Sequence, residues 1–300
     1  MDDYKAKLAE LLEVAESHLL GKREVIKQVV CCLLADGHLL IEDHPGLGKT
    51  TLVKVISKLF GLSSSRIQFT NDLLPADILG VSIYEQDQGE FTFHPGPIFS
   101  QLVLADEINR ASPRTQSACL EAMEERQVTV DGQTFILPRP FFIVATQNPR
   151  DQIGSYDLPQ SQLDRFLMVL SIGYPAREDE KKILLRTRKE QDLSELSPII
   201  DTKLLVELQL KVEEVRVSPE ILDKFINILE RSRSIATGLS VRAGIRYLHA
   251  SKAWAFLNGR NFVIPEDIVA MSYPLLMHRF WESSRDEAKA LVDKVINIDW

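Results

Sequence analysis

The sequence has few cysteines and no long hydrophobic stretch. Only three of its 300 residues are cysteine, and two of these are adjacent, so a disulfide framework cannot form. The longest apolar run, Val29–Ala35, is far shorter than the roughly 18 residues that a transmembrane helix needs. The acidic stretch after Met1 lacks the apolar segment of a signal peptide. We therefore expect a protein of the reducing cytoplasm without stable membrane insertion.

The sequence also has fewer positively charged residues than negatively charged ones. The chain carries 35 Lys and Arg residues against 43 Asp and Glu, a formal net charge of −8. A protein that coats nucleic acid or an anionic membrane needs a basic face, so this balance argues against both. The hydrophobic fraction of 45% is that of an ordinary globular protein with a real core. The length suggests one large domain or two modest ones.

The first part of the chain alternates helical patterns with short apolar runs. Helices are expected at Asp2–Leu19, at Arg23–Ala35 and at Thr50–Phe60. Strands are expected at residues 38–41, 66–69, 102–105, 141–145 and 166–172. Strands separated by helix-length segments form a parallel sheet covered by helices on both faces. The sequence therefore predicts an α/β fold with a three-layer αβα core.

Two alternating segments interrupt this pattern, and a third change follows near residue 175. Residues 81–93 and 128–136 each read as a β-hairpin, the second with Asp131 and Gly132 at its turn. After Gly173 only helical patterns remain, at residues 178–189, 201–212, 219–232, 241–257, 265–271 and 282–294. We therefore predict an α/β domain over residues 1–175 with two hairpin insertions, and an all-α domain over residues 176–300.

The strongest chemical signal is the octapeptide DHPGLGKT, which begins at Asp43 between a predicted strand and a predicted helix. It matches the phosphate-binding pattern G-x-x-x-x-G-K-[ST], except that Asp43 replaces the first glycine. Gly46 and Gly48 let backbone N–H groups turn inward around an anion. Lys49 supplies a charge for the β- and γ-phosphates, and Thr50 a hydroxyl ligand for Mg²⁺. The Asp43 side chain is expected to weaken the match, because it occupies a tight turn.

A second signal predicts that the bound nucleotide is hydrolysed. The apolar run from Leu102 ends in two carboxylates, Asp106 and Glu107. Asp106 can hold the water shell of Mg²⁺, and Glu107 can orient and polarise the attacking water. A third strand leads to Asn148, and the carboxyl ends of parallel strands share one edge of the sheet. We therefore expect Asn148 beside the γ-phosphate or the attacking water.

The sequence resembles the MoxR family of AAA+ ATPases, which is related to the magnesium-chelatase ATPase subunit and to the minichromosome-maintenance helicases. The resemblance covers nearly the whole chain and is most specific over residues 38–170. Its segments are Ile67–Thr70, Asp72–Pro75, Gly89–Pro97, Ala105–Ala111, Glu121–Val128, Ala145–Pro149 and Leu158–Phe166. The resemblance implies a P-loop AAA+ core followed by a helical lid.

The resemblance also implies roles for particular residues. Asn148 is similar to the first sensor, Arg165 to the arginine finger and Arg242 to the second sensor. Whether Arg242 serves its own subunit or a neighbour stays open, and Arg110 and Arg114 are further candidates for reaching across an interface. The residues implied in nucleotide binding are Leu20 and Gly21 beside the adenine, and Asp43, His44, Pro45, Gly46, Leu47, Gly48, Lys49, Thr50 and Thr51 around the phosphates.

An arginine finger acts on a neighbouring subunit, so the resemblance implies a homo-oligomeric ring, hexameric as in the family. It implies ATP hydrolysis that remodels or activates a protein client, with metal insertion or complex assembly as possible outcomes, and a partner of von Willebrand factor A type. Two alternatives are a nucleic-acid motor and a nucleotide-gated scaffold with little turnover. The first hairpin tip carries Glu85, Asp87 and Glu90, which argues against nucleic acid. Phe91 and Phe93 either grip a peptide or pack beneath the hairpin.

Overall fold

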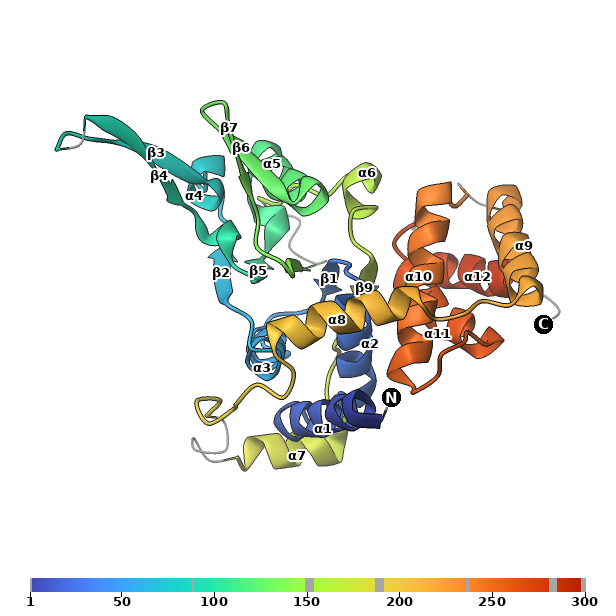
Figure 1. Ribbon diagram of the computed structural model, residues 1–300. Helices are drawn as coiled ribbons and strands as arrows, with labels where there is room; N and C mark the ends of the chain where they lie inside the picture. The colour runs from blue at the N-terminus through green and yellow to red at the C-terminus, as the bar shows by residue number, and fades with distance from the viewer. Residues whose placement is uncertain are drawn as a thin grey trace.

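The computed structural model describes residues 2–87, 89–148, 154–186, 192–235, 238–280 and 285–297. A sheet flanked by helices occupies one side of the molecule, and a group of helices near the C-terminus occupies the other (Figure 1). One residue of the segments that resemble the family, Pro149 at the end of Ala145–Pro149, lies outside the described residues.

One parallel sheet forms the centre of the first part. Its order is β2-β5-β8-β1-β9. The bounds are β1 (Leu39–Glu42), β2 (Ser64–Gln68), β5 (Leu102–Asp106), β8 (Phe142–Gln147) and β9 (Met168–Leu170). The strand predicted over residues 166–172 is shorter, and at its end the backbone N–H groups of Ile172 and Gly173 instead donate to Asp43, in the loop after β1. Since all five strands run the same way, the residues that follow β1, β5 and β8 meet at one edge.

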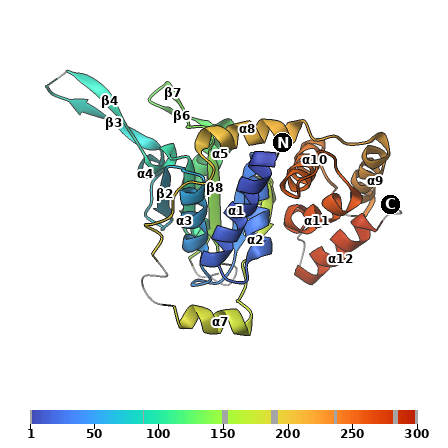
Figure 2. The ribbon, with the colours of Figure 1, turned by 60° about the horizontal axis from the view of Figure 1, so that its bottom comes forward.

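Helices cover both faces of this sheet. One face packs against α1 (Asp2–His18), α2 (Arg23–Leu34) and α3 (Lys49–Leu59), and Figure 2 shows α1 and α3 in front of the strands. The other face packs against α4 (Pro75–Leu79) and α5 (Pro113–Glu125). The short helix α6 (Gln160–Leu163) and the 3₁₀ turns Pro97–Phe99 and Ile108–Arg110 complete this part. The predicted three-layer αβα core is confirmed.

Both predicted hairpins are present. They are formed by β3 (Gly80–Glu85) with β4 (Glu90–Pro95), and by β6 (Gln127–Val130) with β7 (Gln133–Ile136). They project from the same side of the core, as Figures 1 and 2 both show. The Phe93 ring stacks on that of Phe135 with centroids 3.9 Å apart, whereas Phe91 is 72% exposed. Phe93 therefore packs between the hairpins, and Phe91 faces solvent.

The regular elements described after Gly173 are helices. They are α7 (Arg177–Leu184), α8 (Thr202–Glu213), α9 (Pro219–Ile235), α10 (Val241–Leu257), α11 (Pro265–Leu276) and α12 (Arg285–Ile296). Residues 187–189 and 282–284 of the predicted helices lie outside the described residues. Helix α8 packs on both α2 and α10, so one hydrophobic cluster continues from the core into the later helices. We keep the division near residue 175 as a proposal. Within the described ranges, no helix has both the length and the apolar character to cross a membrane.

Candidate active site

The loop between β1 and α3 has the backbone geometry of an anion cradle. Gly46 has a φ angle of +85° and Gly48 one of +89°, a region that glycine adopts without strain. Helix α3 begins at Lys49, directly after Gly48. Its first N–H groups have no partner within the helix, and the helix dipole places partial positive charge at this end. The loop and the helix start together can surround a phosphate.

A cleft of about 420 Å³ opens beside this loop. From the predicted residues of the loop and helix start, its walls include Pro45, Gly46, Gly48, Lys49, Thr50 and Thr51. The strand ends contribute Asp106, Glu107 and Asn148. Segments about 100 residues apart in sequence therefore meet at one site, because β8 lies between β1 and β5 in the sheet.

The other predicted nucleotide-binding residues, Leu20, Gly21, Asp43, His44 and Leu47, are not part of the cleft wall. The turn between α1 and α2 nevertheless lies next to the loop. A β carbon added to Gly48 would lie 3.8 Å from the Leu19 side chain. One added to Gly21 would lie only 2.3 Å from the carboxylate of Asp179 on α7. The expected adenine segment thus lies between the phosphate loop and α7, and its contact with adenine stays a prediction.

Asp43 does not crowd the turn as we expected. Its side chain is only 6% exposed and is directed toward the segment after β9. There its carboxylate accepts hydrogen bonds from the Ser171 hydroxyl at 3.2 Å, from the Gly173 N–H at 2.9 Å and from the Ile172 N–H. The Lys22 ammonium donates to three carbonyls of the same segment, at 2.8 to 3.0 Å. The aspartate therefore anchors the phosphate loop to the chain that leaves the sheet.

Restoring glycine at this position is expected to destabilise the protein. Asp43→Gly would leave the N–H groups of Ile172 and Gly173 without their acceptor, at a cost of roughly 2–4 kcal/mol in the free energy of unfolding. Urea denaturation measures the change, and Asp43→Asn, which keeps one acceptor oxygen, should lose less. An unfolding midpoint equal to that of the wild type in Asp43→Gly would refute this role.

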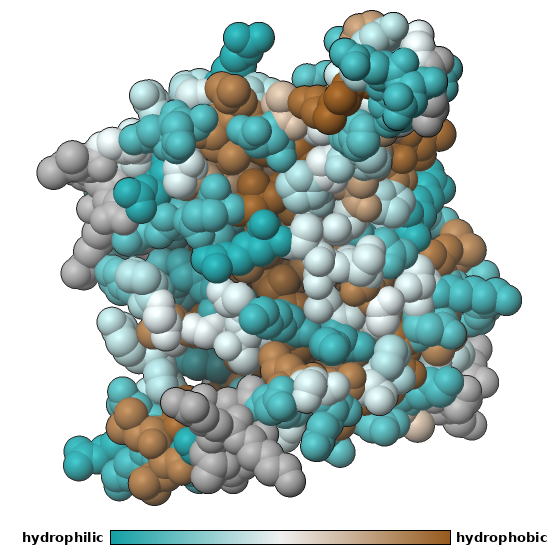
Figure 3. All heavy atoms as spheres, turned by 90° about the vertical axis from the view of Figure 1, so that its left-hand side faces the viewer, coloured by the Kyte–Doolittle hydropathy of each residue, from teal (hydrophilic) through white to brown (hydrophobic). Residues whose placement is uncertain are grey.

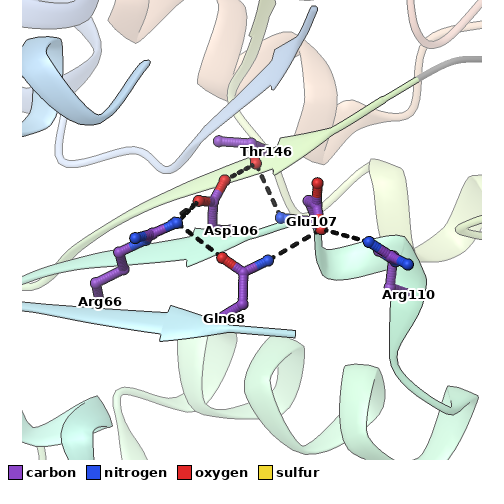
Figure 4. A network of polar contacts seen from close by, with 6 residues as sticks. All are labelled: Arg66, Gln68, Asp106, Glu107, Arg110 and Thr146. Carbon is purple, nitrogen blue, oxygen red and sulfur yellow. Dashed lines mark hydrogen bonds and ion pairs between the residues drawn. The ribbon is translucent and has the colours of Figure 1, made fainter. Parts of the chain in front are cut away.

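Thr146 aligns the two acidic residues that follow β5 (Figure 4). Its hydroxyl donates to Oδ1 of Asp106 at 2.6 Å and accepts from the N–H of Glu107 at 2.9 Å. Glu107 itself has a left-handed backbone with φ +56°, which turns its side chain away from the line of the strand. The other Asp106 oxygen accepts from Arg66 Nη2 at 2.6 Å. Both carboxylates are therefore held in defined orientations at the mouth of the cleft.

The Glu107 carboxylate is held by two donors. Its Oε2 accepts from Gln68 Nε2 at 3.0 Å and from Arg110 Nη1 at 3.1 Å, as Figure 4 shows. Arg110, a candidate for reaching across an interface, thus pairs with a carboxylate of its own chain. Arg114 is exposed on the first turn of α5. The two donors fix the orientation of this side chain at the cleft, where a carboxylate can orient and polarise a water molecule.

The remaining polar groups of the cleft suit a magnesium–nucleotide complex. The Lys49 ammonium donates to the Asp43 carbonyl at 2.5 Å. Partial burial lowers the pKa of Lys49, while the nearby carboxylates of Asp43, Asp106 and Glu107 act in the opposite direction. The Thr50 hydroxyl and the Asp106 carboxylate line the same cleft, and Mg²⁺ prefers such oxygen ligands. The residues present therefore fit Mg²⁺ together with phosphate.

Arg165 and Arg242 lie outside the cleft. Both pair with Glu124 near the end of α5, Arg165 through Nε at 3.3 Å and Arg242 through Nη2. The structure therefore brings the predicted finger and the predicted second sensor together, but away from the phosphate loop of their own chain.

Sequence reasoning missed four polar residues of this arrangement: Arg66, Gln68, Thr146 and Glu124. Three of them lie in segments that carried the family resemblance, and Arg66 directly precedes one. The available signal was the position of Arg66, Gln68 and Thr146 near the carboxyl ends of strands that flank β5. Their partners could not be read from the sequence, since neither the strand order nor the register is a local property.

Comparison with known proteins identifies the family of this fold. The chain matches the profile of the ATPase family associated with various cellular activities (AAA) over residues 38–168, and that of the AAA lid domain over residues 230–295. A solved structure described as a candidate ATPase from Cytophaga hutchinsonii superimposes with a TM-score of 0.86 at 33% identity, covering 98% of this chain and 94% of that one. The fold is thus that of an AAA+ ATPase.

Two curated relatives narrow the assignment. The chain is 45% identical to the uncharacterized protein YeaC of Bacillus subtilis, across 92% of this chain and 88% of the relative. It is 37% identical to chaperone MoxR1 of Mycobacterium tuberculosis, across 87% of this chain and 72% of the relative. The chain belongs to the MoxR family of AAA+ ATPases, which confirms the resemblance seen in the sequence.

Proposed function

We propose that the chain binds ATP with Mg²⁺ in the cleft beside α3 and hydrolyses it to ADP and phosphate. The observation that carries this proposal is the convergence of Lys49, Asp106 and Glu107 on one cleft. Lys49 holds the β- and γ-phosphates, and Glu107 orients the attacking water. Asn148 lines the same cleft and hydrogen-bonds the γ-phosphate or that water.

Thr50 and Asp106 are the residues that would hold Mg²⁺. When bound, the ion neutralises charge on the phosphates. Arg66 and Thr146 keep the Asp106 carboxylate oriented toward the cleft, and Gln68 with Arg110 does the same for Glu107. Phosphoryl transfer needs mainly positioning and charge stabilisation, which is what these contacts provide.

We further propose that copies of the chain form a ring, hexameric as in the family. Arg165 and Arg242 share Glu124 and lie outside their own cleft, which supports the action of both on a neighbouring copy. A guanidinium supplied in this way neutralises charge that develops on the transferred phosphoryl group. We therefore propose that Arg242, whose site the sequence left open, serves the site of the neighbour.

The ring would act on a protein client in the cytoplasm as a chaperone-like remodeller, in line with the name of MoxR1. We propose that this remodelling serves metal insertion into the client or the assembly of a complex. We also propose that the ring works with a partner protein of von Willebrand factor A type. Exposed apolar side chains on the hairpins support a protein client, among them Phe91 at 72% and Ile136 at 77% exposed. Figure 3, seen from the side of the first hairpin, shows hydrophobic residues at the surface among hydrophilic ones. The acidic hairpin tip disfavours nucleic acid.

Phosphate release by the wild-type protein tests the proposal directly. Specific activity should rise with protein concentration, because each site needs a neighbour, and light scattering should show assembly with nucleotide. Single-stranded DNA should leave the rate unchanged, whereas stimulation by DNA would favour the motor. A protein that stays monomeric at high concentration and releases no phosphate would overturn the proposal, and ATP binding without turnover would favour the scaffold.

A further inference from the structure

The segment Glu121–Val128 resembles the family but has no role in the site described so far. Near its centre, Glu124 lies on the last turn of α5 and joins two parts of the molecule. Its Oε2 faces Nε of Arg165, 3.3 Å away, in the loop after α6. Its Oε1 pairs with Nη2 of Arg242 on α10. One carboxylate therefore links a guanidinium from the sheet-bearing part to one from the later helices.

The loop that carries Arg165 is also held from the later helices. Arg246 on α10 donates from Nη1 to the Asp164 carbonyl at 2.8 Å. Arg279, buried just after α11, donates from Nε to the Asp164 carboxylate at 2.9 Å. The position of the Arg165 backbone thus depends on α10 and on the segment after α11, while the position of its side chain depends on Glu124.

Charge explains why a carboxylate is needed here. Arg165, Arg242 and Arg246 are three like charges close together, and like charges in a partly buried site repel. These three arginines hold the pKa of Glu124 below its ordinary value, with the Arg242 hydrogen bond as the largest cause, so the carboxylate stays ionised. The ion pairs use one nitrogen of Arg165 and one of Arg242, and each guanidinium has further N–H groups that can bind a phosphate.

We propose that Glu124 is a positioning residue that holds Arg165 and Arg242 as one unit and presents both to the nucleotide of a neighbouring copy. The inference rests on the proposed function, in which the two arginines act on a neighbour. It adds that finger and second sensor move together, because a single carboxylate from α5 joins them.

A mixed assembly separates this role from a purely structural one. Donor copies carry Glu107→Gln, which disables their own site but keeps their arginines. Acceptor copies carry Arg165→Ala, which keeps their cleft but removes their finger. Mixing the two should restore phosphate release above that of either variant alone. Adding Glu124→Gln to the donor should then lower the restored rate roughly 10- to 100-fold, the effect expected of misplaced reacting groups.

The same substitution in the acceptor is the decisive comparison. The acceptor's arginines face a disabled donor site, so Glu124→Gln there should leave the restored rate unchanged. Glu125→Gln in the donor is the matched control, since it makes the same charge change at the next, exposed residue of α5. Glu124→Asp in the donor keeps the charge on a shorter side chain and should recover part of the rate. Binding of a fluorescent ATP analogue to each variant verifies that its own cleft is intact.

The outcomes are distinct. An equal loss with Glu124→Gln in donor and acceptor would show a structural role and overturn the proposal, as would an unchanged rate with the substitution in the donor. If Glu124→Gln fails to assemble, Glu124→Asp takes its place, and a loss with Glu124→Asp that is equal in donor and acceptor overturns the proposal too. If the wild type hydrolyses ATP but the two parent variants restore nothing on mixing, action on a neighbour is wrong, and the ring part of the proposed function fails with it.

Discussion

Glu107→Gln is expected to bind ATP normally and to release phosphate roughly 10²–10⁴ times more slowly than the wild type. The amide keeps the size of the side chain and its position beside Gln68, but loses the charge that polarises the attacking water. Lys49 and the loop glycines, which we propose bind the phosphates, are untouched. Single-turnover measurements give the rate of phosphate release, and titration with a fluorescent ATP analogue gives the affinity for ATP.

Glu121→Gln is a suitable control for this substitution, because it makes the same charge change at an exposed residue of α5. It should change neither binding nor turnover. If Glu107→Gln hydrolysed ATP at a rate close to that of the wild type, the water-orienting role would belong to another group. If it lost ATP binding as well, the variant would report on the integrity of the cleft and not on the reaction, and the assigned role would be wrong.

Arg165→Ala is expected to lose roughly 10³–10⁵ in kcat, the range known for removal of an arginine finger. Because Arg165 does not line the cleft of its own chain, the affinity of that cleft for ATP should hold. The loss should persist at protein concentrations that saturate assembly, since the missing guanidinium cannot be replaced by more copies of the same variant. Steady-state turnover measured against protein concentration gives kcat, and an ATP-binding titration gives the affinity of the cleft.

Arg177→Ala removes an exposed arginine at the start of α7 and serves as the control, with no expected effect on turnover. A turnover of Arg165→Ala equal to that of the wild type would exclude the finger role. A large loss of ATP affinity without loss of kcat would place Arg165 in the binding of nucleotide by its own chain, in conflict with its position beside Glu124.

Most of the fold could be predicted from local patterns. The strands β1, β5 and β8 are continuous apolar runs, as strands covered on both faces must be, and the hairpin at Asp131 follows from its turn residues. The errors are at element ends that depend on distant contacts. The strand β9 ends at Leu170 because Asp43 binds the next three residues, and no pattern within residues 166–172 reports on Asp43.

In the candidate site, too, residues in local motifs could be predicted, whereas features that depend on distant contacts could not. Lys49, Thr50, Asp106 and Glu107 were predicted because each belongs to a short motif next to a strand, and parallel strands bring such motifs to one edge. Asp43 was assigned the wrong effect, because its motif describes the loop backbone and not the direction of the side chain. Whether Arg242 faces its own cleft or a neighbour could not be predicted, since the placement of α10 against α5 depends on packing between separate helices.

The amino-acid sequence by itself determined the family, the α/β class and the order in which the phosphate loop, the acidic pair and the arginines occur. These are local properties, read from residue types at fixed short spacings. Only the tertiary structure decided that Gln68 holds Glu107, 39 residues away, and that Glu124 holds Arg242, 118 residues away. Such contacts follow from strand order and helix packing, which sum many weak apolar contacts over the whole chain and leave no trace in any single segment.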